Sequence, residues 1–400
     1  MSDSRMGRVV VLVLAAALAV LAVGCSGKAP RTPVGVLDTP EHHCRTGNDF
    51  LDAAAYGPAL RAFDTALELR PDYAPALAGR AVVAAGNGSA DMAVALLDTA
   101  LDNADDDREL LLVATAGLRM HALLARAGAE DEATMLSLSG DLYDESLDIL
   151  EDDAAHALRR DEPALYYYRA ESLLAVYRFQ DAADLYARIV ALREGMEDKA
   201  DARWRFVQDV MRAAPRTVVG KHIALVDALS RADLAALLRE ELGADRFFAR
   251  TRDTQGNAFG PPRTPGSVTS PLMPRDLEGH PLAADVAQVL DYGLRGLMVY
   301  PDGMFRPDEP VSRAELAMVL EDVAAQAGRD DGLRTRFIGR ASPYADVRAD
   351  HAAFNAVMFC TTGGLMRVGA VDGLFRPLAP VSGVDAVLAV QGLRSQLQVF

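Results

Sequence analysis

Two short motifs place an arginine two residues before a carboxylate, which is a combination that can bind an anionic ligand. Arg231 precedes Asp233 and Arg313 precedes Glu315, with one alanine between them in each case. A guanidinium group holds a carboxylate through two parallel hydrogen bonds. An arginine in the first turn of a helix also opposes the helix dipole, so its presence there needs another reason. We therefore take these four side chains as candidate binding residues.

The elements around the second motif are repeated further along the chain. Three pairs of similar residues are each 70 residues apart, which indicates an internal duplication: Asp276 and Asp346, Asp302-Gly303 and Asp372-Gly373, and Val311-Ser312 and Val381-Ser382. In each copy an Asp-Gly pair predicts a tight turn, and the phenylalanine that follows is expected to enter the core. Ser312 and Glu315 form a capping box that predicts a helix from Arg313 to about Ala325.

The duplicated segment resembles the S-layer homology domains. The resemblance rests on Pro-Asp-Gly-Met-Phe-Arg-Pro at 301–307, followed by Val-Ser-Arg-Ala-Glu at 311–315, and on the second copy at 372–385. It implies three units packed as a pseudo-threefold trimer within one chain, with grooves that bind cell-wall polymers. In that family the arginine contributes to a groove that receives an acidic or pyruvylated glycan.

A third unit is therefore expected, and its remnant is Leu-Ser-Arg-Ala-Asp at 229–233, after a helix with Trp204 and Val210. The resemblance carries the binding role to Arg231 with Asp233 and to Arg313 with Glu315. The last motif has Gly383 where the arginine belongs, so at most two grooves are expected to be competent.

The N-terminus predicts export and lipid attachment. An apolar run from Val9 to Val23 follows two arginines and is 15 residues long, which is short of the roughly 20 that a membrane span needs. The Leu-Ala-Val-Gly-Cys sequence at 21–25 resembles a bacterial lipobox. It implies cleavage before Cys25 and acylation of that cysteine, with an ordinary secretory signal as the alternative.

Residues 48–198 carry a second kind of repeat. Ala59, Phe63 and Ala66 are spaced by four and three, and Ala93, Leu97 and Ala100 repeat this spacing 34 residues later. A third unit includes Tyr166 and Ala170, followed by Ala182, Tyr186 and Ile189. The pattern resembles the tetratricopeptide repeat, which implies stacked helix pairs with a concave face that binds a peptide or partner helix. The stretch 108–160 is interpreted as one or two degenerate helix pairs.

Other candidate sites are weaker. The side chains of Tyr166, Tyr167, Tyr168, Arg169 and Tyr177 are interpreted as packing between helices in preference to ligand contacts. The acidic clusters at 102–107 and 151–153 lack the ligand spacing of a calcium loop. His42-His43-Cys44 has no second pair of ligands, so no metal is predicted. Free thiols at Cys44 and Cys360 are favoured over a disulfide.

Catalysis is not predicted. The sequence lacks Gly-x-Ser-x-Gly, a glycine-rich phosphate loop and His-Glu-x-x-His, so neither a catalytic residue nor a cofactor is assigned. With 57 acidic and 41 basic residues, the 400-residue chain has a formal net charge of −16, which disfavours nucleic-acid binding. Three cysteines exclude a disulfide-stapled scaffold.

The predicted domains are a signal peptide at 1–24, a lipidated flexible spacer at 25–47, helical repeats at 48–198 and an S-layer-like domain at 199–400. Its units are expected at about 199–245, 272–328 and 342–398, with a loop at 251–274. The whole chain is predicted to be mainly α-helical.

The predicted function is that of an envelope lipoprotein, on the periplasmic face of the outer membrane, that tethers cell-wall polymer or peptidoglycan and docks a protein partner. The alternative is an assembly or secretion-accessory lipoprotein whose S-layer-like part binds protein. A concealed wall hydrolase is a third hypothesis.

Overall fold

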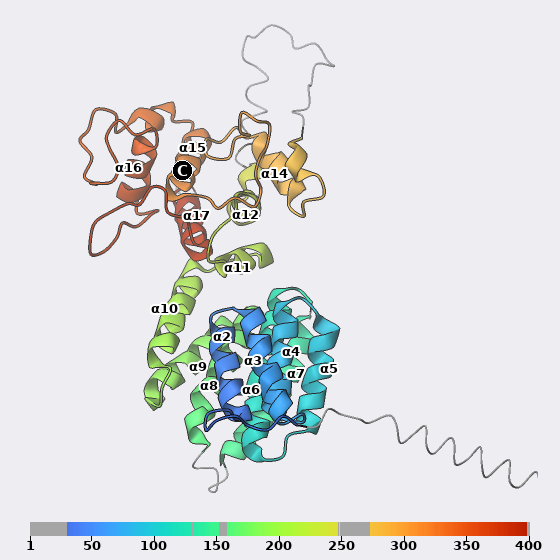
Figure 1. The fold of residues 1–400 in the computed structure, drawn as a ribbon. Coiled ribbons are helices and arrows are strands. Elements are labelled where there is room, and N and C mark those ends of the chain that lie inside the picture. The colour runs from blue at the N-terminus through green and yellow to red at the C-terminus, as the bar shows by residue number, and fades with distance from the viewer. Residues whose placement is uncertain (1–29, 130, 152–157, 247, 249–272, 398–400) are drawn as a thin grey trace, which may run out of the picture. The chain divides into compact units, whose positions relative to one another are not determined.

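The computed structural model describes residues 30–129, 131–151, 158–246, 248 and 273–397 (Figure 1). The described chain is mainly α-helical and contains no strand beyond isolated bridges, as the sequence predicts. It divides into two compact units, residues 1–201 and 202–400, which are taken separately below. Cys25, the apolar run before it and all but the last two residues of the 251–274 loop lie outside the described residues.

Unit 1 is a series of helices in which each packs against its neighbours along the chain (Figure 1). Its elements are α2 (Pro40–Asp52), α3 (Tyr56–Leu69), α4 (Ala74–Gly86), α5 (Ala90–Asp102), α6 (Asp107–Arg126), α7 (Glu132–Glu151), η2 (Arg159–Asp161), α8 (Glu162–Ala175) and α9 (Phe179–Leu192). Helices α2, α4, α6 and α8 also contact one another in succession, which forms a layer of alternate helices. The 108–160 stretch, where the repeat was degenerate, contains the two long helices α6 and α7.

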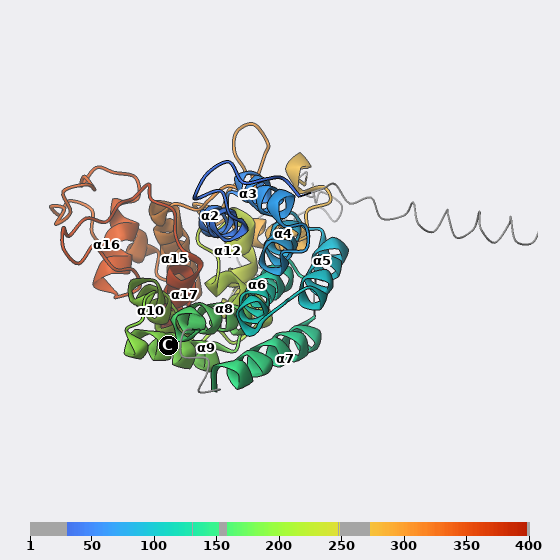
Figure 2. The ribbon, with the colours of Figure 1, turned by 60° about the horizontal axis from the view of Figure 1, so that its bottom comes forward.

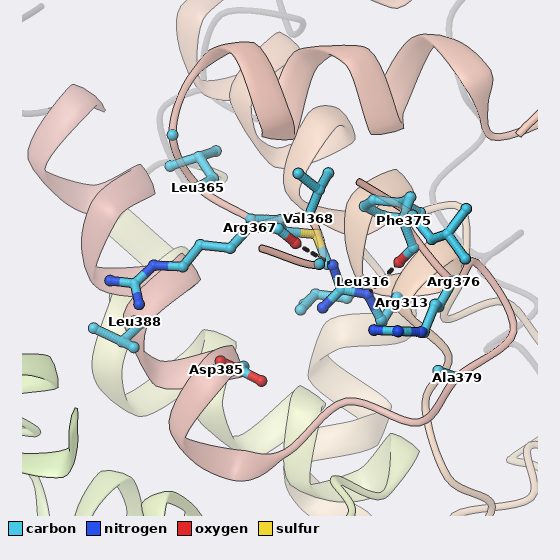
Figure 3. A pocket seen from close by; sticks show the side chains of 14 residues that line it. Arg313, Leu316, Leu365, Arg367, Val368, Phe375, Arg376, Ala379, Asp385 and Leu388 are labelled. Atoms are coloured by element: carbon cyan, nitrogen blue, oxygen red, sulfur yellow. Dashed lines mark hydrogen bonds between the residues drawn. The ribbon is translucent and has the colours of Figure 1, made fainter. Parts of the chain in front are cut away.

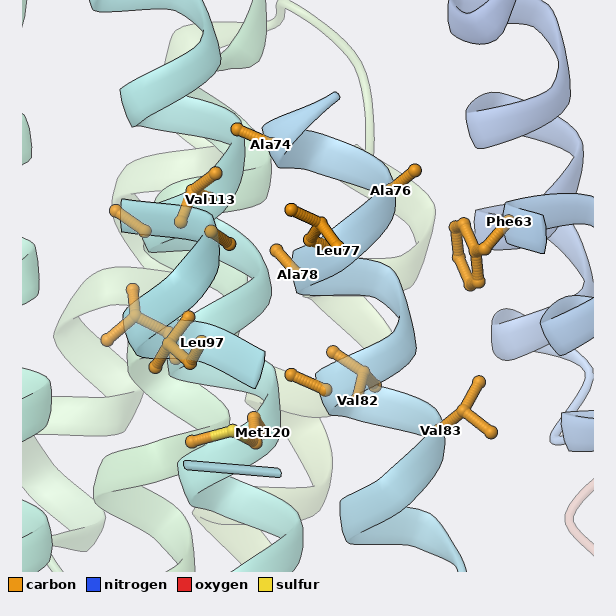
Figure 4. Close-up of a cluster of buried hydrophobic side chains, with 14 of the residues drawn as sticks. Phe63, Ala74, Ala76, Leu77, Ala78, Val82, Val83, Leu97, Val113 and Met120 are labelled. Atoms are coloured by element: carbon orange, nitrogen blue, oxygen red, sulfur yellow. The ribbon is translucent and has the colours of Figure 1, made fainter. Parts of the chain in front are cut away.

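The residues of the helical repeat pattern lie in the core of unit 1. Ala59, Phe63 and Ala66 of α3 are completely buried, and so are Ala93 and Ala100 of α5. Small residues allow the helix backbones to approach closely, while the phenylalanine fills the space between them. Figure 4 shows Phe63 on one side of α4 and Leu97 and Val113 on the other, so α4 is packed on two faces.

The prediction of a flexible spacer at 25–47 is wrong for residues 40–47, because helix α2 begins at Pro40. Thr39 caps this helix by accepting a hydrogen bond from the backbone N–H of His42, and proline occupies the first helical position, where its missing N–H costs nothing. Cys44 and Gly47 are buried. A Cβ atom at Gly47 would lie 2.5 Å from the Phe63 ring, so the glycine allows α2 to approach α3.

Helix α10 (Glu197–Ala213) spans the boundary at residue 201 and contains Trp204 and Val210, as predicted. Unit 2 continues with short helices joined by turns, seen from another direction in Figure 2. They are α11 (Val218–Ala224), α12 (Arg231–Leu237), the π-helix η3 (Leu238–Leu242), η4 (Arg275–Leu277), α14 (Ala283–Leu290), α15 (Arg313–Gly328), η5 (Asp331–Thr335), α16 (Phe354–Thr362) and α17 (Gly383–Leu397). No described helix is long and apolar enough to cross a membrane.

A closed ring of backbone hydrogen bonds joins the three motifs at the centre of unit 2. Leu229 N–H donates to Val381 O at 2.8 Å, Val381 N–H donates to Val311 O at 3.0 Å, and Val311 N–H donates to Leu229 O at 2.8 Å. Each of these residues precedes the serine of its motif. The ring therefore arranges the starts of α12, α15 and α17 around one point.

Each of the two Asp-Gly turns is held by an aspartate from the start of the same repeated copy. Asp276 accepts hydrogen bonds from the backbone N–H groups of Phe305 and Arg306, and Asp346 accepts the same pair from Phe375 and Arg376. Both arginines have positive φ angles of 57–58°. Such a conformation is unfavourable for a residue with a side chain, so the carboxylate hydrogen bonds stabilise it. This contact explains the 70-residue offset of the two aspartates.

Candidate functional site

The capping boxes at the first two motifs form as the serine and acid spacing requires. Ser230 pairs with Asp233 at the start of α12, and Ser312 pairs with Glu315 at the start of α15. Asp233 and Glu315 therefore each accept hydrogen bonds from the backbone N–H and hydroxyl of their serine. The helix from Arg313 that the sequence predicts is confirmed, and it ends at Gly328.

Arg231 is buried, with only 2 % of its side chain exposed. Its three guanidinium nitrogens each donate at 2.8 Å to a backbone carbonyl, at Phe305, Gly296 and Met298. The Tyr300 ring covers the guanidinium with its centroid 4.9 Å away, and a carboxylate oxygen of Glu315 lies 3.7 Å from it. All three guanidinium nitrogens of Arg231 therefore donate within the fold. They hold the segment 296–305, which contains the first Asp-Gly turn, against helix α12.

Arg313 occupies the equivalent place at the start of α15, where it contacts the segment around the second Asp-Gly turn, but it is only half-buried. Its Nε donates to Phe375 O at 2.7 Å and its Nη2 donates to Arg367 O. Its Nη1 has no acceptor within the described chain. Burial lowers the pKa of Arg313, and the nearby charge of Asp385 acts against that effect. Asp385 forms no ion pair with Arg313 in the described residues, whereas Glu315 reaches Arg231.

At the third motif, the place of the arginine is filled by backbone. A Cβ atom at Gly383 would lie 1.7 Å from the carbonyl oxygen of Ile223, in helix α11. The N–H of Gly383 donates to Val226 O at 2.9 Å. Glycine is therefore required here by close backbone contact, which the sequence alone did not reveal.

A cavity of about 380 Å³ lies beside Arg313, between helix α15 and the segment around the second Asp-Gly turn (Figure 3). Three arginines line it, Arg313, Arg367 and Arg376, together with the single acid Asp385. Figure 3 shows Arg313 between the carbonyl oxygens of Arg367 and Phe375, with the Arg376 and Arg367 side chains on opposite sides of it. Arg376 forms an ion pair with Asp372, but Arg367 is exposed and makes no side-chain contact of this kind in the described residues. The cavity wall is therefore positive in a chain whose net charge is −16.

The structure thus separates the four predicted binding residues. Asp233 and Glu315 cap helices, Arg231 is buried, and Arg313 lines an open cavity. Their predicted role in binding polymer stays a prediction. The sequence reasoning missed Arg367 and Arg376, although both could have been found because they flank the duplicated Asp-Gly turn.

Unit 1 contains a groove made of two cavities that share Asp52, Arg119 and Tyr168. Cavities of about 250 and 220 Å³ are lined mainly by α2, α6 and α8. Arg119 donates to Asp52 at 2.8 Å and to the Tyr168 hydroxyl at 2.7 Å, and Lys199 donates to Asp52 at 3.2 Å. Burial alone would raise the pKa of Asp52, but the charges of Arg119 and Lys199 outweigh it and lower the pKa.

The tyrosine cluster belongs mostly to the packing. Tyr166 and Tyr167 are buried, and Tyr167 meets Tyr186 edge to face. Tyr168 is the exception, because its hydroxyl faces the groove and contacts Asp52 at 3.0 Å.

The His42-His43-Cys44 cluster is spread between surface and core. His43 contacts Asp38 at 2.8 Å, while Cys44 is buried and its burial raises the pKa of the thiol to about 12. Cys360 is buried in unit 2, and both thiols are free. No group of three metal-binding side chains occurs within the described ranges.

Comparison with known proteins identifies one module. The family model described as S-layer homology domain matches residues 297–317, which cover the Asp-Gly turn, the ring residue Val311 and the start of α15. The chain contains an S-layer homology domain in this region.

The chain is also similar to cell surface glycoprotein 1 of Acetivibrio thermocellus, with 40% identity over 84 residues. The match covers 21% of this chain and 3% of that protein, so the chain spans a small part of its relative. No solved structure matches the chain.

Proposed function

We propose that the protein is an envelope tether whose unit 2 binds an anionic cell-wall polymer, acting by binding and without catalysis. The observation that supports this proposal most strongly is the positive cavity at Arg313, formed next to the matched S-layer homology segment. The similarity to a cell surface glycoprotein favours the same location. Unit 2 is then a pseudo-threefold domain of the S-layer homology type, and the hydrogen-bond ring supports that arrangement.

The ligand is identified by sedimentation with purified wall sacculi. The chain from Ser26 onward is mixed with sacculi before and after mild acid removal of the attached polymers. We expect it to pellet with untreated sacculi and to remain in the supernatant with stripped ones. Equal pelleting would identify peptidoglycan itself as the ligand, and no pelleting in either case would refute wall binding.

We further propose that lipid on Cys25 anchors the chain in the outer membrane, and that residues 48–198 are tetratricopeptide-like repeats that dock a protein partner. The groove with Asp52, Arg119 and Tyr168 supports the second part, because it combines an aromatic side chain with charges of both signs. Labelling with radioactive palmitate, with Cys25→Ser as the control, tests the lipid.

A photo-crosslinking amino acid tests the docking groove. It is placed at Tyr168 in the groove and, as a control, at Met92, which is 59 % exposed on α5. A discrete adduct from position 168 that is missing from position 92 is expected, and adducts of equal yield from both would count against a docking groove.

A further inference from the structure

Lys199 places a cation inside the unit 1 groove. It is the single lysine of residues 30–201, and it lies in the first turn of α10. Its ammonium group donates to Asp52 at 3.2 Å and lies 4.5 Å from the centroid of the Tyr167 ring and 5.9 Å from that of Tyr168. A carboxylate and aromatic ring faces attract an ammonium or guanidinium group. The groove therefore contains a cation-binding site, and a side chain of the same protein fills it.

The connector before α10 turns the chain so that Lys199 reaches the groove. Arg193, Gly195 and Met196 have φ angles of 56°, 106° and 66°, and two of these residues are not glycine. Met196 also lines the groove. Positive φ angles are unfavourable for residues with a side chain and persist where surrounding contacts hold them, often at functional sites. The strained connector thus starts α10 at the edge of the groove.

The contacts of Lys199 are of a kind that another cation can replace. The Lys199 side chain is 40 % exposed and that of Asp52 is 48 % exposed, so solvent screens their attraction. Arg119 and Tyr168 donate to the other carboxylate oxygen of Asp52, at 2.8 and 3.0 Å. If the ammonium group leaves, Asp52 keeps these two donors and offers its second oxygen to a new cation. Lysine has a flexible four-carbon stem, so this exchange requires no movement of α10.

The charge of unit 1 indicates which kind of partner fits. Residues 30–201 carry 33 acidic and 15 basic side chains, whereas residues 202–400 carry 23 of each, so the negative charge is concentrated in unit 1. Apart from Lys199, the charged side chains that line the groove are Asp49, Asp52, Glu171, Arg119 and Arg126. Acids outnumber arginines in this set. A basic segment is therefore attracted to unit 1 and finds an acceptor in its groove.

We infer that Lys199 is an internal competitor in the unit 1 groove, and that the partner is a basic protein segment whose lysine or arginine side chain takes its place. The incoming cation binds the Asp52 carboxylate and the faces of Tyr167 and Tyr168, while Arg119 stays on Asp52. Because the partner must displace Lys199, its measured affinity is reduced by the fraction of chains in which the lysine fills the site. This inference rests on the proposed function, since it names the chemistry of the partner that docks on the helical repeats.

The test uses two peptides that differ in charge alone, acetyl-tetraarginine amide and acetyl-tetracitrulline amide. Each is titrated calorimetrically into the chain from Ser26 at about 0.15 M salt, where long-range attraction is largely screened. We expect one tetraarginine site per chain. Citrulline has the shape of arginine but an uncharged urea group, so tetracitrulline should show no detectable binding.

Two variants with matched controls locate the site. Asp52→Asn should weaken tetraarginine binding about tenfold, because it removes the carboxylate that receives the guanidinium group. Asp98→Asn removes the same charge from an exposed position of α5 and should change the affinity less than about twofold. Lys199→Ala should strengthen binding about fivefold, because the competitor is gone. Arg61→Ala removes a positive charge from an exposed position of α3 outside the groove and should have no such effect.

Lysine acetylation followed by mass spectrometry reads the displacement directly. The chain from Ser26 has three lysines, Lys28, Lys199 and Lys221, and neither acetylated peptide has an amine that consumes the reagent. Saturating tetraarginine should raise the acetylation rate of Lys199 several-fold, because its ammonium group leaves Asp52. Lys221, in α11, is the internal control and should keep its rate.

Five results would overturn the inference. They are no tetraarginine binding, equal binding of tetracitrulline, equal weakening by Asp52→Asn and Asp98→Asn, unchanged affinity in Lys199→Ala, and a Lys199 acetylation rate that stays constant or falls when tetraarginine binds.

The crosslinking test at Tyr168 separates this failure from that of the proposed function. A discrete adduct at position 168 without tetraarginine binding that depends on Asp52 keeps the docking groove and rejects a basic partner. Tetraarginine binding that depends on Asp52, without a discrete adduct, rejects protein docking and keeps the cation site.

Discussion

At the scale of single residues, the same residue type at the same motif position can have different surroundings. Arg231 and Arg313 occupy the same position of a Ser-Arg-Ala-acid motif, yet one is buried and the other lines a cavity. The surrounding residues come from far along the chain. The Tyr300 ring covers the Arg231 guanidinium, whereas Gly369 lines the cavity beside Arg313. A motif therefore predicts the fold of its own segment better than it predicts access to the side chain.

Replacing the two arginines should separate stability from binding. Arg231→Ala leaves three buried carbonyls without their donor and should lower the free energy of unfolding by roughly 3–5 kcal/mol. Arg313→Ala removes two hydrogen bonds at a half-buried position and should cost about 1–2 kcal/mol. Urea unfolding followed by circular dichroism checks both values. Equal losses in the two variants would contradict the difference in burial.

Gly383 should tolerate no side chain. In Gly383→Ala the new methyl group meets the Ile223 carbonyl, so we expect a loss of about 1–3 kcal/mol in the free energy of unfolding from overpacking. Gly328→Ala is the matched control, because it lies at the end of α15 with no atom within 4 Å of the new Cβ. A Gly383→Ala variant as stable as the control would show that α11 does not press on this position.

The buried thiols should resist reagents in the folded chain. Burial raises the pKa of Cys44 to about 12 and raises that of Cys360 well above its usual range, so neither forms a reactive thiolate at neutral pH. Alkylation with iodoacetamide at pH 8, read by mass spectrometry, should be slow for both residues and become complete in urea. Rapid labelling of either one in the native chain would contradict its burial.

At the scale of elements, the duplicated turns depend on an aspartate that lies 29 residues before the turn phenylalanine in sequence. Asp346→Ala removes two hydrogen bonds to backbone N–H groups and should cost about 1.5–3 kcal/mol. Some burial acts to raise the pKa of Asp346, but the N–H groups of Arg376 and Phe375 outweigh it and lower the pKa.

The sign of the pH dependence follows from that lowered pKa. The stabilisation by Asp346 is present above the pKa of the unfolded carboxyl, near 3.8, and is lost as pH falls below that value towards the folded pKa. The stability difference between the unchanged chain and Asp346→Ala should therefore be constant from pH 5 to 7 and shrink below about pH 4. Unfolding midpoints measured across this range check it, and a difference that grows on acidification would be contrary to this contact.

The elements also show what could be predicted from the sequence. The capping box at Ser312 fixed the start of α15 because it depends on neighbouring residues alone. The sequence does not predict the start of α2, because the prolines and glycines of residues 30–47 indicate a linker and one possible cap at Thr39 does not outweigh them. Contacts such as Phe63 against Gly47 are not encoded in local spacing and appear only when the helices are packed.

At the scale of the whole molecule, the cavity at Arg313 has a positive wall in a chain that is acidic as a whole. The three arginines around the Arg313 cavity oppose a net charge of −16, so binding of a polyanion should weaken as salt screens the attraction. The duplication was visible in the sequence as a constant offset. The ring that joins three motifs was not, because its third member keeps only a short sequence match at Leu229.

The most direct test of the central claim is the affinity of the chain for untreated sacculi, measured with the Arg313→Gln variant. Glutamine keeps much of the side-chain volume but removes the charge, so the fold should stay intact and the amount that pellets should fall about tenfold. Arg348→Gln should pellet like the unchanged chain. If Arg313→Gln pellets equally well while remaining folded, the cavity at Arg313 is not where the wall polymer binds.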